Sequence, residues 1–510
     1  MSSTRAVPAS MDGSHEIDTP ARHPGWVLAC VSVCTILVVG FVASINLAVP
    51  KLAASGLHPS ASQLLWIVDA YVVLFASLVI PAGAVGDRFG RKGALIAGLV
   101  IFALGSVVSA AAGAVPVMLI GRAVTGIGAA CVLPNALAVL IHATEPARRP
   151  RAIAIWAGMT GIGGVIGNVG GGAVLSAGSW RWLFIAVAPI AAGCALWVAL
   201  GAPRSSRHDR PLDLPAAVVL TLAILALLLG ITQGPERGWA GAFVIGSFAA
   251  AVVLFGAWTV MELRVAHPLL DPRLFKIPEL RAASLGMLIV FFGMFGFFYL
   301  NASLMQYGRG FTVLQAGLGV VPMTIPVVAL ARFVPDLVRR YGQRTVIGVA
   351  FVVIACGIYG LATALHHGYL VYACWLVVVG TGTALSVPAL TAAISGALPP
   401  RQAGVAGGLQ STTREFGSAL GVAVIGTLLT ARFTRHLSEV TPDVTSGGRT
   451  PGTVAEALAA APGRHDAVIA AYTASAGTAL KVVAALVLVV AVLILAEMTW
   501  AAHRTRRSGD

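Results

Sequence analysis

The sequence predicts an all-α integral membrane protein of fourteen transmembrane helices, in which two six-helix bundles related by pseudo-two-fold symmetry flank two inserted helices. Three observations predict this fold. First, 57% of the 510 residues are hydrophobic and only 11% are charged, whereas a soluble domain carries about 25% charged residues. Second, the apolar residues form runs long enough to cross a bilayer. Third, the second half of the chain repeats motifs of the first.

Fourteen apolar runs are candidate transmembrane helices, because a helix needs about 20 predominantly apolar residues to cross the hydrocarbon core. The runs are 27–49, 63–86, 93–113, 115–141, 151–176, 181–201, 214–232, 240–262, 281–304, 313–337, 344–365, 370–397, 405–430 and 476–500. All six cysteines lie inside these runs. Since no CxxC or CxxH spacing joins them, we expect them to pack as small core residues and to bind no metal.

Basic residues orient the predicted helices, because Lys and Arg of short loops stay on the cytoplasmic side. With the N-terminus inside, most of the 34 Lys and Arg fall in inner loops and tails. The first 24 residues are polar and lack a signal-peptide cleavage pattern. Both termini are therefore predicted to be cytoplasmic, in a multi-pass protein of the plasma (inner) membrane. The net charge of +14 follows from this bias, and no basic helix or stripe predicts a nucleic-acid partner.

The two halves of the chain share motifs at a nearly constant offset of 252 to 254 residues. The pairs are GIGAACVLP (126–134) with GTGTALSVP (380–388), Gly163 and Gly167 with Gly417 and Gly421, and RFGRK (88–92) with RYGQR (340–344). Two like-oriented bundles that face each other form a central cavity, as in many secondary transporters. The predicted units are a cytoplasmic tail 1–26, a six-helix bundle 27–203, two inserted helices with linkers 204–280, a second six-helix bundle 281–500 with an extracellular loop 431–475, and a cytoplasmic tail 501–510.

Charge concentrates in GAVGDRFGRKGAL (83–95), between the second and third apolar runs. This segment resembles the signature G-x-x-x-D-R-x-G-R-K of the major facilitator superfamily, and the fourteen runs resemble its drug:proton antiporter branch of multidrug and antiseptic exporters. The matching residues are Gly83, Asp87, Arg88, Gly90, Arg91 and Lys92. The resemblance implies a latch that opens and closes as the two halves rock.

Two residues of this latch have roles that chemistry alone suggests. Gly90 permits a tight turn with positive φ between two helices. Asp87 sits at a helix end, where it can pair with nearby arginines or cap a neighbouring helix. The alternative, a positive loop that only orients the chain, would explain Arg91 and Lys92 but neither Asp87 nor the glycine spacing.

Arg122 lies within the fourth run, in IGRAVTGIGAACVLP (120–134). An arginine inside the membrane costs a few kcal/mol unless it is paired or hydrated. The stretch resembles the R-x-x-x-G-x-G motif of the superfamily, whose arginine is implicated in proton coupling. The alternative is a structural role, in which Arg122 hydrogen-bonds to carbonyl groups of the first span.

The fifth run contains the glycine-rich stretch GMTGIGGVIGNVGGG (158–172). Dense glycines remove side chains from one face, so that another helix can approach closely and slide. The stretch resembles the antiporter motif that ends G-P-x-x-G-G. It matches at Gly163, Gly167, Gly171 and Gly172, but Asn168 replaces the proline, which puts the kink of that motif in doubt. Close packing without any coupling role is the alternative.

Two acidic residues are candidate proton sites. Asp69, in LLWIVDAY (64–71), resembles the start of the second span in multidrug exporters and lies several residues below the outer surface. A lipid-facing aspartate would be too costly, so it is expected at a proton or cation site. A hydrated interfacial carboxylate is the alternative. The acid that the family usually has in the first span is replaced by Phe41, so another carboxylate has to carry protons.

Glu415, in QSTTREFGSALG (410–421), is the second candidate. It lies about 15 Å from the inner end of its run at 1.5 Å per residue, close to the middle of the membrane. Arg414 resembles the usual residue of this motif and is a further coupling candidate, but adjacent helical residues do not share a face. We therefore expect no pairing between them. A glutamate that is simply hydrogen-bonded within the bundle is the alternative.

The ninth run, which corresponds to the first, contains the aromatic-rich stretch VFFGMFGFFYLNASLMQY (290–307). Its rings are expected to line the cavity and to stack on flat or cationic substrates, although a ring stripe at helical spacing also suits plain core packing. The candidate cavity residues are Phe41, Trp66, Phe291, Phe295, Phe298, Tyr299 and Gln306.

These features together predict a secondary transporter that exports amphipathic or cationic drugs or antibiotics in exchange for protons by alternating access. It is expected to need no cofactor beyond the proton gradient, to work as a monomer, and to contact only its small-molecule substrate, protons and the bilayer. One alternative is an exporter or uptake carrier for a single metabolite or self-made antibiotic. A remote alternative is a membrane-embedded enzyme or sensor, for which we find no catalytic His–Asp cluster, nucleophile elbow or phosphate-binding loop.

Overall fold

The computed structural model is helical along nearly the whole chain, and it describes residues 24–145, 148–203, 213–265, 268, 271–330, 333–398, 403–440 and 451–507. Among these residues there is no β-strand. The first six helices are α1 (Pro24–Ala53), α2 (Ala61–Phe89), α3 (Arg91–Ala110), α4 (Val115–Ala143), α5 (Arg149–Ser176) and α6 (Arg181–Gly201). The inserted helices are α7 (Leu214–Arg237) and α8 (Ala242–Arg264).

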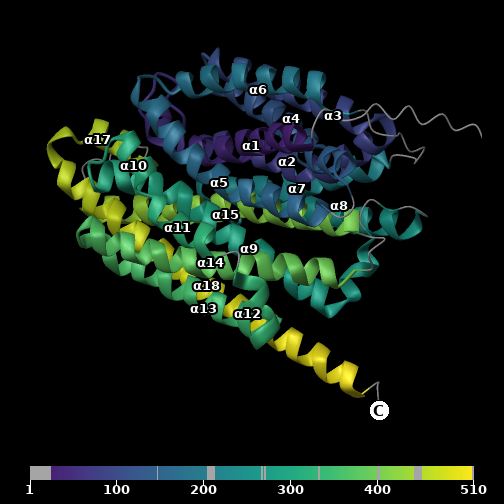
Figure 1. Cartoon of the computed structure of the whole chain (residues 1–510). Helices are drawn as coiled ribbons and strands as arrows, with labels where there is room; N and C mark the ends of the chain where they lie inside the picture. Colours follow the sequence, from purple (N-terminus) through teal and green to yellow (C-terminus); the bar gives the residue numbers. More distant parts are fainter. Residues whose placement is uncertain are drawn as a thin grey trace, which may run out of the picture.

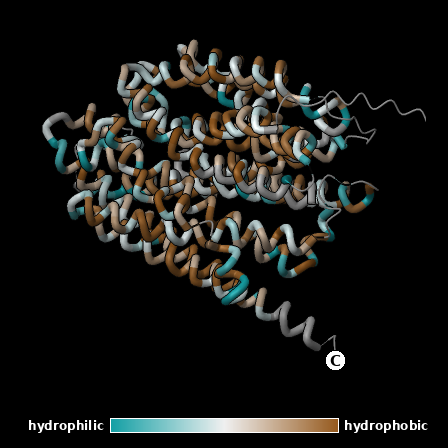
Figure 2. The backbone as a smooth tube through the Cα atoms, in the orientation of Figure 1, coloured by the Kyte–Doolittle hydropathy of each residue, from teal (hydrophilic) through white to brown (hydrophobic). Residues whose placement is uncertain are grey.

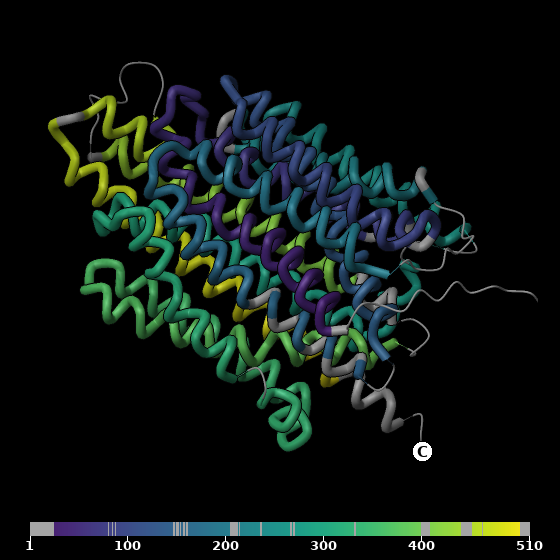
Figure 3. Tube along the Cα trace, turned by 45° about the horizontal axis from the view of Figure 1, so that its top comes forward, coloured from purple at the N-terminus to yellow at the C-terminus, as the bar shows by residue number. Residues whose placement is uncertain are grey.

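The second half continues the helical pattern. Its helices are α9 (Pro278–Ser303), α10 (Val313–Leu318), α11 (Val321–Leu330), α12 (Val334–Tyr341), α13 (Gln343–Thr363), α14 (Tyr369–Gly396), α15 (Ala403–Val440), α17 (Val454–Ala460) and α18 (His465–Arg507). The predicted run 313–337 is therefore divided among three helices. Figure 1 shows α1–α6 above and most of the later helices below, and in the turned view of Figure 3 helices of the second half are seen behind those of the first.

Thirteen helices in the described part of the chain are long and apolar enough to cross a membrane. The predicted fifth run coincides with α5, where the described apolar stretch Ile162–Ser176 is shorter. Hydrophilic residues gather toward the ends of the bundle and hydrophobic ones along its middle (Figure 2). This distribution is what a bilayer requires of a multi-pass helical protein.

The segment 431–475, predicted as an extracellular loop, contains more helix than that prediction implies. α15 continues to Val440, and α18 begins at His465. These extensions bury Phe433, Leu437 and Tyr472 while their other faces stay polar. Such amphipathic turns lack the continuous hydropathy that marks a membrane span. The predicted runs 405–430 and 476–500 are therefore shorter than the helices α15 and α18 that contain them.

The internal repeat is confirmed by the packing of its glycines. At several positions a methyl group on a glycine would clash with the backbone of a neighbouring helix, and the same contact recurs in the other half. The recurring contacts are Gly167 with Gly40 and Gly421 with Phe292, and Gly126 with Tyr71 and Gly380 with Met323. Because both partners of each contact shift by 252 or 254 residues, the two halves share one pattern of helix packing.

The turn after the second helix of each half also recurs. Gly90 separates α2 from α3 with φ of 107°, and Gly342 separates α12 from α13 with φ of 80°. The positive φ predicted for Gly90 is thus confirmed, and it is a conformation that side chains other than glycine rarely adopt. In both halves the basic residue two positions later donates to a backbone carbonyl in, or directly after, the last helix of that half. Lys92 Nζ donates to the Ala202 carbonyl at 2.7 Å, and Arg344 Nη2 donates to the Met498 carbonyl at 2.5 Å.

The inserted helix α7 packs against α2 of the first half and α15 of the second. Gln233 Nε2 donates to Ser62 Oγ at 2.7 Å, Ser62 Oγ donates to the Thr232 carbonyl at 3.3 Å, and Thr427 Oγ1 donates to the Ile231 carbonyl at 3.5 Å. α8 lies on the outside of α7 and exposes large apolar side chains, as a lipid-facing helix does. α7 therefore covers the line along which α2 and α15 meet.

Candidate transport site

Arg122 is fully buried where α4 packs against α2. Its Nε donates to the Ile67 carbonyl at 2.8 Å and its Nη2 to the Val68 carbonyl at 3.4 Å. Its Cζ lies 5.0 Å from the centre of the Phe41 ring and 4.8 Å from that of Tyr71, so two ring faces stabilise the cation. The carbonyls that it binds belong to the second helix, whereas the structural alternative in the sequence analysis placed them on the first.

Asp69 lies on α2, directly after Ile67 and Val68, and is also fully buried. Arg122 of α4 binds the Ile67 and Val68 carbonyls, which directly precede Asp69 in the chain. Within the described residues, neither carboxylate oxygen of Asp69 accepts a hydrogen bond. A buried carboxylate without a donor is unfavourable, so this site has the capacity to take up a proton, a water molecule or a cation.

Glu415 pairs with its sequence neighbour, and the expectation that the two would not interact was wrong. Arg414 Nε donates to Glu415 Oε1 at 2.8 Å, because the long arginine side chain bends around α15 to reach it. The guanidinium also lies 5.7 Å from the centre of the Phe291 ring on α9. α15, which carries this pair, packs against α2 of the first half.

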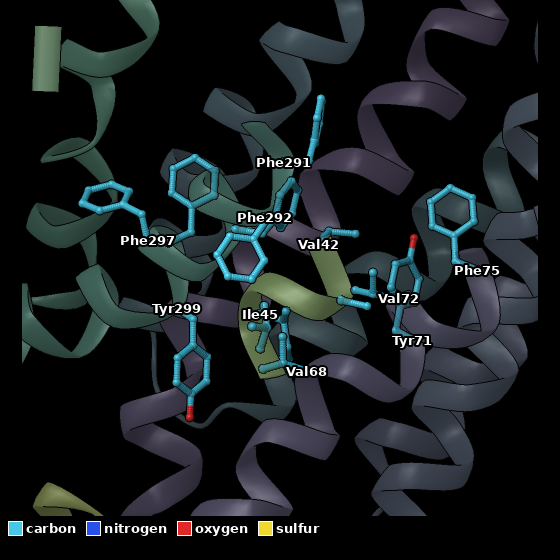
Figure 4. Close-up of a cluster of buried hydrophobic side chains, with 14 of the residues drawn as sticks. Val42, Ile45, Val68, Tyr71, Val72, Phe75, Phe291, Phe292, Phe297 and Tyr299 are labelled. Carbon is cyan, nitrogen blue, oxygen red and sulfur yellow. The ribbon is translucent and has the colours of Figure 1, made fainter. Parts of the chain in front are cut away.

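The aromatic stretch of α9 faces the first half of the chain. Figure 4 shows Phe291, Phe292 and Tyr299 beside Val42 and Ile45 of α1 and Val68 of α2. The remaining rings continue this surface along α9: Phe295 stacks on Phe291 with 6.2 Å between ring centres, and Phe298 meets Phe295 edge to face at 5.8 Å. The four predicted rings Phe291, Phe295, Phe298 and Tyr299 are each 8% exposed. They form a nearly closed aromatic surface between the two halves.

The other three candidate cavity residues lie apart from this surface. Phe41 is enclosed in the first half, where its ring meets those of Tyr71, Phe102 and Phe184 edge to face. Trp66 is half-buried at the edge of the core. Gln306 Nε2 donates to the Leu47 carbonyl of α1 at 3.2 Å, so it joins the ends of the two halves.

A cavity lies at the end of the bundle opposite the chain termini, which the orientation of the basic residues predicts to be the outer end. It is small, with a volume of about 50 Å³. Its wall comes from α1, α2, α9, α15 and α18, and residues 452–455 form one side. Tyr299, Ser303, Tyr307, Thr430 and Tyr472 contribute hydroxyl groups, and none of the lining residues is charged.

The glycine-rich face of α5 contacts both halves. Gly167 meets α1, where Ser44 Oγ donates to its carbonyl at 2.6 Å, and Gly171 lies against the same serine. Gly172 approaches the backbone of Val313 on α10. The remaining positions are Gly163, which packs on α1, and Asn168, whose Nδ2 donates to the Gly164 carbonyl at 2.9 Å. α5 runs as one helix through Asn168.

The latch residues lie at the end of the bundle where the termini are. Arg91 Nη1 donates to the Gly83 carbonyl at 3.2 Å, and the Arg88 guanidinium lies over the Phe89 ring at 5.6 Å. The side chain of Asp87 lies outside the described residues. These contacts and the bond from Lys92 to α6 connect the turn between α2 and α3 to its own half.

Sequence reasoning missed Tyr71, which packs against Arg122. It is fully buried, its ring lies against the Arg122 guanidinium, and its hydroxyl donates to the Val38 carbonyl of α1 at 3.4 Å. It closes the same LLWIVDAY stretch that contains Asp69, so an aromatic residue two positions from a membrane carboxylate was the available signal. No group of three or more His, Cys, Asp or Glu that could hold a metal occurs in the part of the chain described.

Comparison with known proteins gives the same architecture. A bacterial homolog of the human lysosomal transporter Spinster, in an inward-facing and unoccupied conformation, aligns with a TM-score of 0.69 and 17% identity over 93% of this chain and 96% of that one. This likeness shows the fold.

Curated relatives are resistance and export proteins. The methylenomycin A resistance protein of Streptomyces coelicolor is 31% identical over 82% of this chain and 89% of its own length. The tetracenomycin C resistance and export protein of Streptomyces glaucescens is 29% identical over 76% and 72%. The methyl viologen resistance protein SmvA of Salmonella typhimurium is 30% identical over 81% and 84%.

The family model described as Major Facilitator Superfamily matches residues 31–422, which include both sets of repeated motifs. That superfamily consists of membrane transporters, so the remote alternative of an enzyme or sensor is set aside. The resemblance on which the sequence analysis relied is confirmed, and the chain belongs to the Major Facilitator Superfamily.

Proposed function

We propose that this protein exports amphipathic, aromatic or cationic compounds across the plasma membrane in exchange for protons, and that it works as a monomer. The two bundles 27–203 and 281–500 rock against each other in this scheme, so that the site between them opens to one side at a time. The supporting comparison is with relatives whose names record resistance to methylenomycin A and methyl viologen.

The observation that carries the proposal is a pair of buried carboxylates, one in each half. Asp69 lacks a hydrogen-bond donor among the described residues, and Glu415 has Arg414 as its partner. An exchange of proton for substrate requires groups whose charge changes with the conformation of the protein, and buried carboxylates that bridge two moving halves meet that requirement.

The aromatic surface of α9 supplies the substrate-binding side of the proposal. Phe291 and Phe295 offer stacked ring faces, and such faces bind flat rings and cations. Proton uptake at Asp69 or Glu415 on the outer side would favour release of a cationic substrate, and proton loss inside would reset the carrier. The substrate and the proton then compete for one charged state of the site, which is the origin of the coupling.

The test is efflux of a fluorescent aromatic cation from energised membrane vesicles. Dissipating the pH gradient should abolish efflux by the wild-type protein. Glu415→Gln and Asp69→Asn should bind the dye yet lose gradient-driven transport, whereas Asp466→Asn, which changes an exposed carboxylate outside the membrane, should behave as wild type. Efflux that ignores the gradient, or full activity of Glu415→Gln, would refute the mechanism.

A narrower function is favoured by the names of two relatives, each of which records a single antibiotic. In this alternative the protein carries one defined compound. A panel of unrelated toxic cations separates the two proposals, because only a multidrug exporter transports several of them.

A further inference from the structure

Three buried hydroxyl groups meet where the inserted helix α7 crosses the two halves of the chain. They belong to Ser62 of α2, Thr232 of α7 and Thr427 of α15, and none of these residues is more than 4% exposed. We call them the hydroxyl cluster. Polar groups at helix contacts inside a membrane bond across those contacts, because lipid offers them no partner. The bonds around this cluster therefore show how firmly α7 is held to each half.

α7 is held more firmly to α2 than to α15. Ser62 Oγ accepts from Gln233 Nε2 at 2.7 Å and donates to the Thr232 carbonyl at 3.3 Å, so one hydroxyl of α2 makes two bonds to α7. Thr427 Oγ1 of α15 donates to the Ile231 carbonyl at 3.5 Å. This bond is the longest of the three, and hydrogen bonds weaken as they lengthen.

The same crossing lies beside the outer cavity. Leu64 of α2 and Leu429 of α15, each two residues from the hydroxyl cluster, line the cavity. α2 and α15 also touch directly, since a methyl group on Gly426 would clash with the Leu65 side chain. Opening the cavity along this line requires α15 to part from α2, and α7 cannot then stay bonded to both.

We infer that α7 moves with the first half of the chain, and that the contact between Thr427 and Ile231 is the one that breaks when the outer cavity opens. The two bonds through Ser62 are kept in both states. α7 is then a fixed rim of the first half, against which α15 closes. This inference rests on the alternating access of the proposed function and gives the inserted helix a role that the proposed function leaves open.

Single hydroxyl groups test the inference, because a contact shifts an equilibrium only when it differs between the two states. Ser303→Cys places a reporter thiol in the outer cavity. Its rate of modification by a membrane-impermeant maleimide added outside, followed by mass spectrometry of its peptide, measures how often the cavity opens. Thr427→Val should raise this rate by about threefold, the usual contribution of one hydrogen bond between membrane helices, whereas Ser62→Ala should leave it unchanged.

The matched control for Thr427→Val is Thr381→Val. It removes a hydroxyl that donates to the Val377 carbonyl of its own helix, α14, at 2.8 Å, so it should not change the rate. Ser62→Ala should still lower the melting temperature, because it removes two bonds from the folded protein. Equal rates for Thr427→Val and Thr381→Val, or a faster rate for Ser62→Ala, would overturn the inference.

Cross-links provide a second readout. The pair Ile231→Cys with Thr427→Cys ties α7 to α15, and the pair Ser62→Cys with Gln233→Cys ties α7 to α2. A short reducible bifunctional thiol reagent closes each pair, and the single variants treated in the same way control for the natural cysteines. The first link should abolish dye efflux until it is reduced, and the second should leave efflux at the level of the unlinked pair. An α7–α15 link that permits efflux, or an α7–α2 link that stops it, means that α7 does not move with the first half.

The role of α7 and the proposed function fail in different ways. If wild-type efflux ignores the pH gradient, the proposed exchange for protons is wrong, and the maleimide rates still test α7. If efflux follows the gradient and Thr427→Val matches Thr381→Val, only the role of α7 is wrong.

Discussion

Arg414 and Glu415 are adjacent on α15, yet Nε of the arginine lies 2.8 Å from Oε1 of the glutamate, with side chains that are only 17% and 6% exposed. The pair is buried at the surface where the second half meets the first. A buried ion pair costs desolvation free energy that its attraction repays only while both partners are present. The consequence of changing one residue therefore depends on the state of the other.

Removing one member of this pair should destabilise the protein more than removing both. We expect Arg414→Met to lower the free energy of unfolding by about 3–5 kcal/mol, because it leaves an unpaired buried charge. The double variant Arg414→Met with Glu415→Leu should recover most of that loss. Thermal unfolding of the purified protein in detergent measures both effects, and additive losses would show that the residues do not interact.

Arg122→Lys should not substitute for arginine. Lysine keeps the charge but loses the planar group that binds the Ile67 and Val68 carbonyls and lies between two rings. We expect a loss of about 1.5–3 kcal/mol in stability, the usual range for hydrogen bonds from a charged group, together with loss of gradient-driven efflux. Arg237→Lys, at an exposed position, is the control. Wild-type stability and efflux in Arg122→Lys would mean that charge alone suffices.

The close helix contact at Gly167 should tolerate no side chain. Gly167→Ala places a methyl group against the backbone of Gly40, which should force α1 and α5 apart at a cost of about 1–3 kcal/mol, as for other overpacked positions. Gly164→Ala, one turn away with nothing within 4 Å of the added group, should be neutral or slightly stabilising. Equal melting temperatures for the two variants would contradict the packing described.

Aromatic substrates should depend on the rings of α9. Phe295→Leu removes the ring that stacks on Phe291, and we expect the affinity for a flat aromatic cation to weaken by about 0.5–1.5 kcal/mol, the contribution of one ring pair. A tetraalkylammonium cation should be affected less. Phe243→Leu changes an exposed ring on α8 and is the control. Fluorescence titration of the reconstituted protein measures the affinities, and equal losses for both substrates would argue against stacking.

The sequence predicted the fold well because apolar runs and glycine spacing report directly on membrane helices and their contacts. The positive φ of Gly90 and the repeat of Gly167 at Gly421 both followed from local pattern. The contacts between side chains in three dimensions could not be predicted from local pattern. The bend that brings Arg414 onto Glu415 depends on one side-chain conformation, and helical periodicity alone argued against it.

Other differences between prediction and structure also come from contacts or patterns that a local reading of the sequence does not show. Tyr71 was missed because its importance comes from contacts with α4 and α1, which are far away in the sequence. Phe41 was expected at the cavity, but its ring lies against Arg122 within its own bundle. The helical turns around Phe433 and Tyr472 are amphipathic, so hydropathy did not mark them as parts of long helices.

The most direct test of the central claim is substrate-driven proton movement in reconstituted liposomes with no imposed gradient. Adding the dye on one side should produce a pH change on that side for the wild-type protein, reported by a pH-sensitive fluorophore, because export and proton uptake are coupled. Glu415→Gln and Asp69→Asn should each lose that signal, because each single variant is expected to lose coupled transport. Dye movement without any pH change in the wild-type protein would contradict the account.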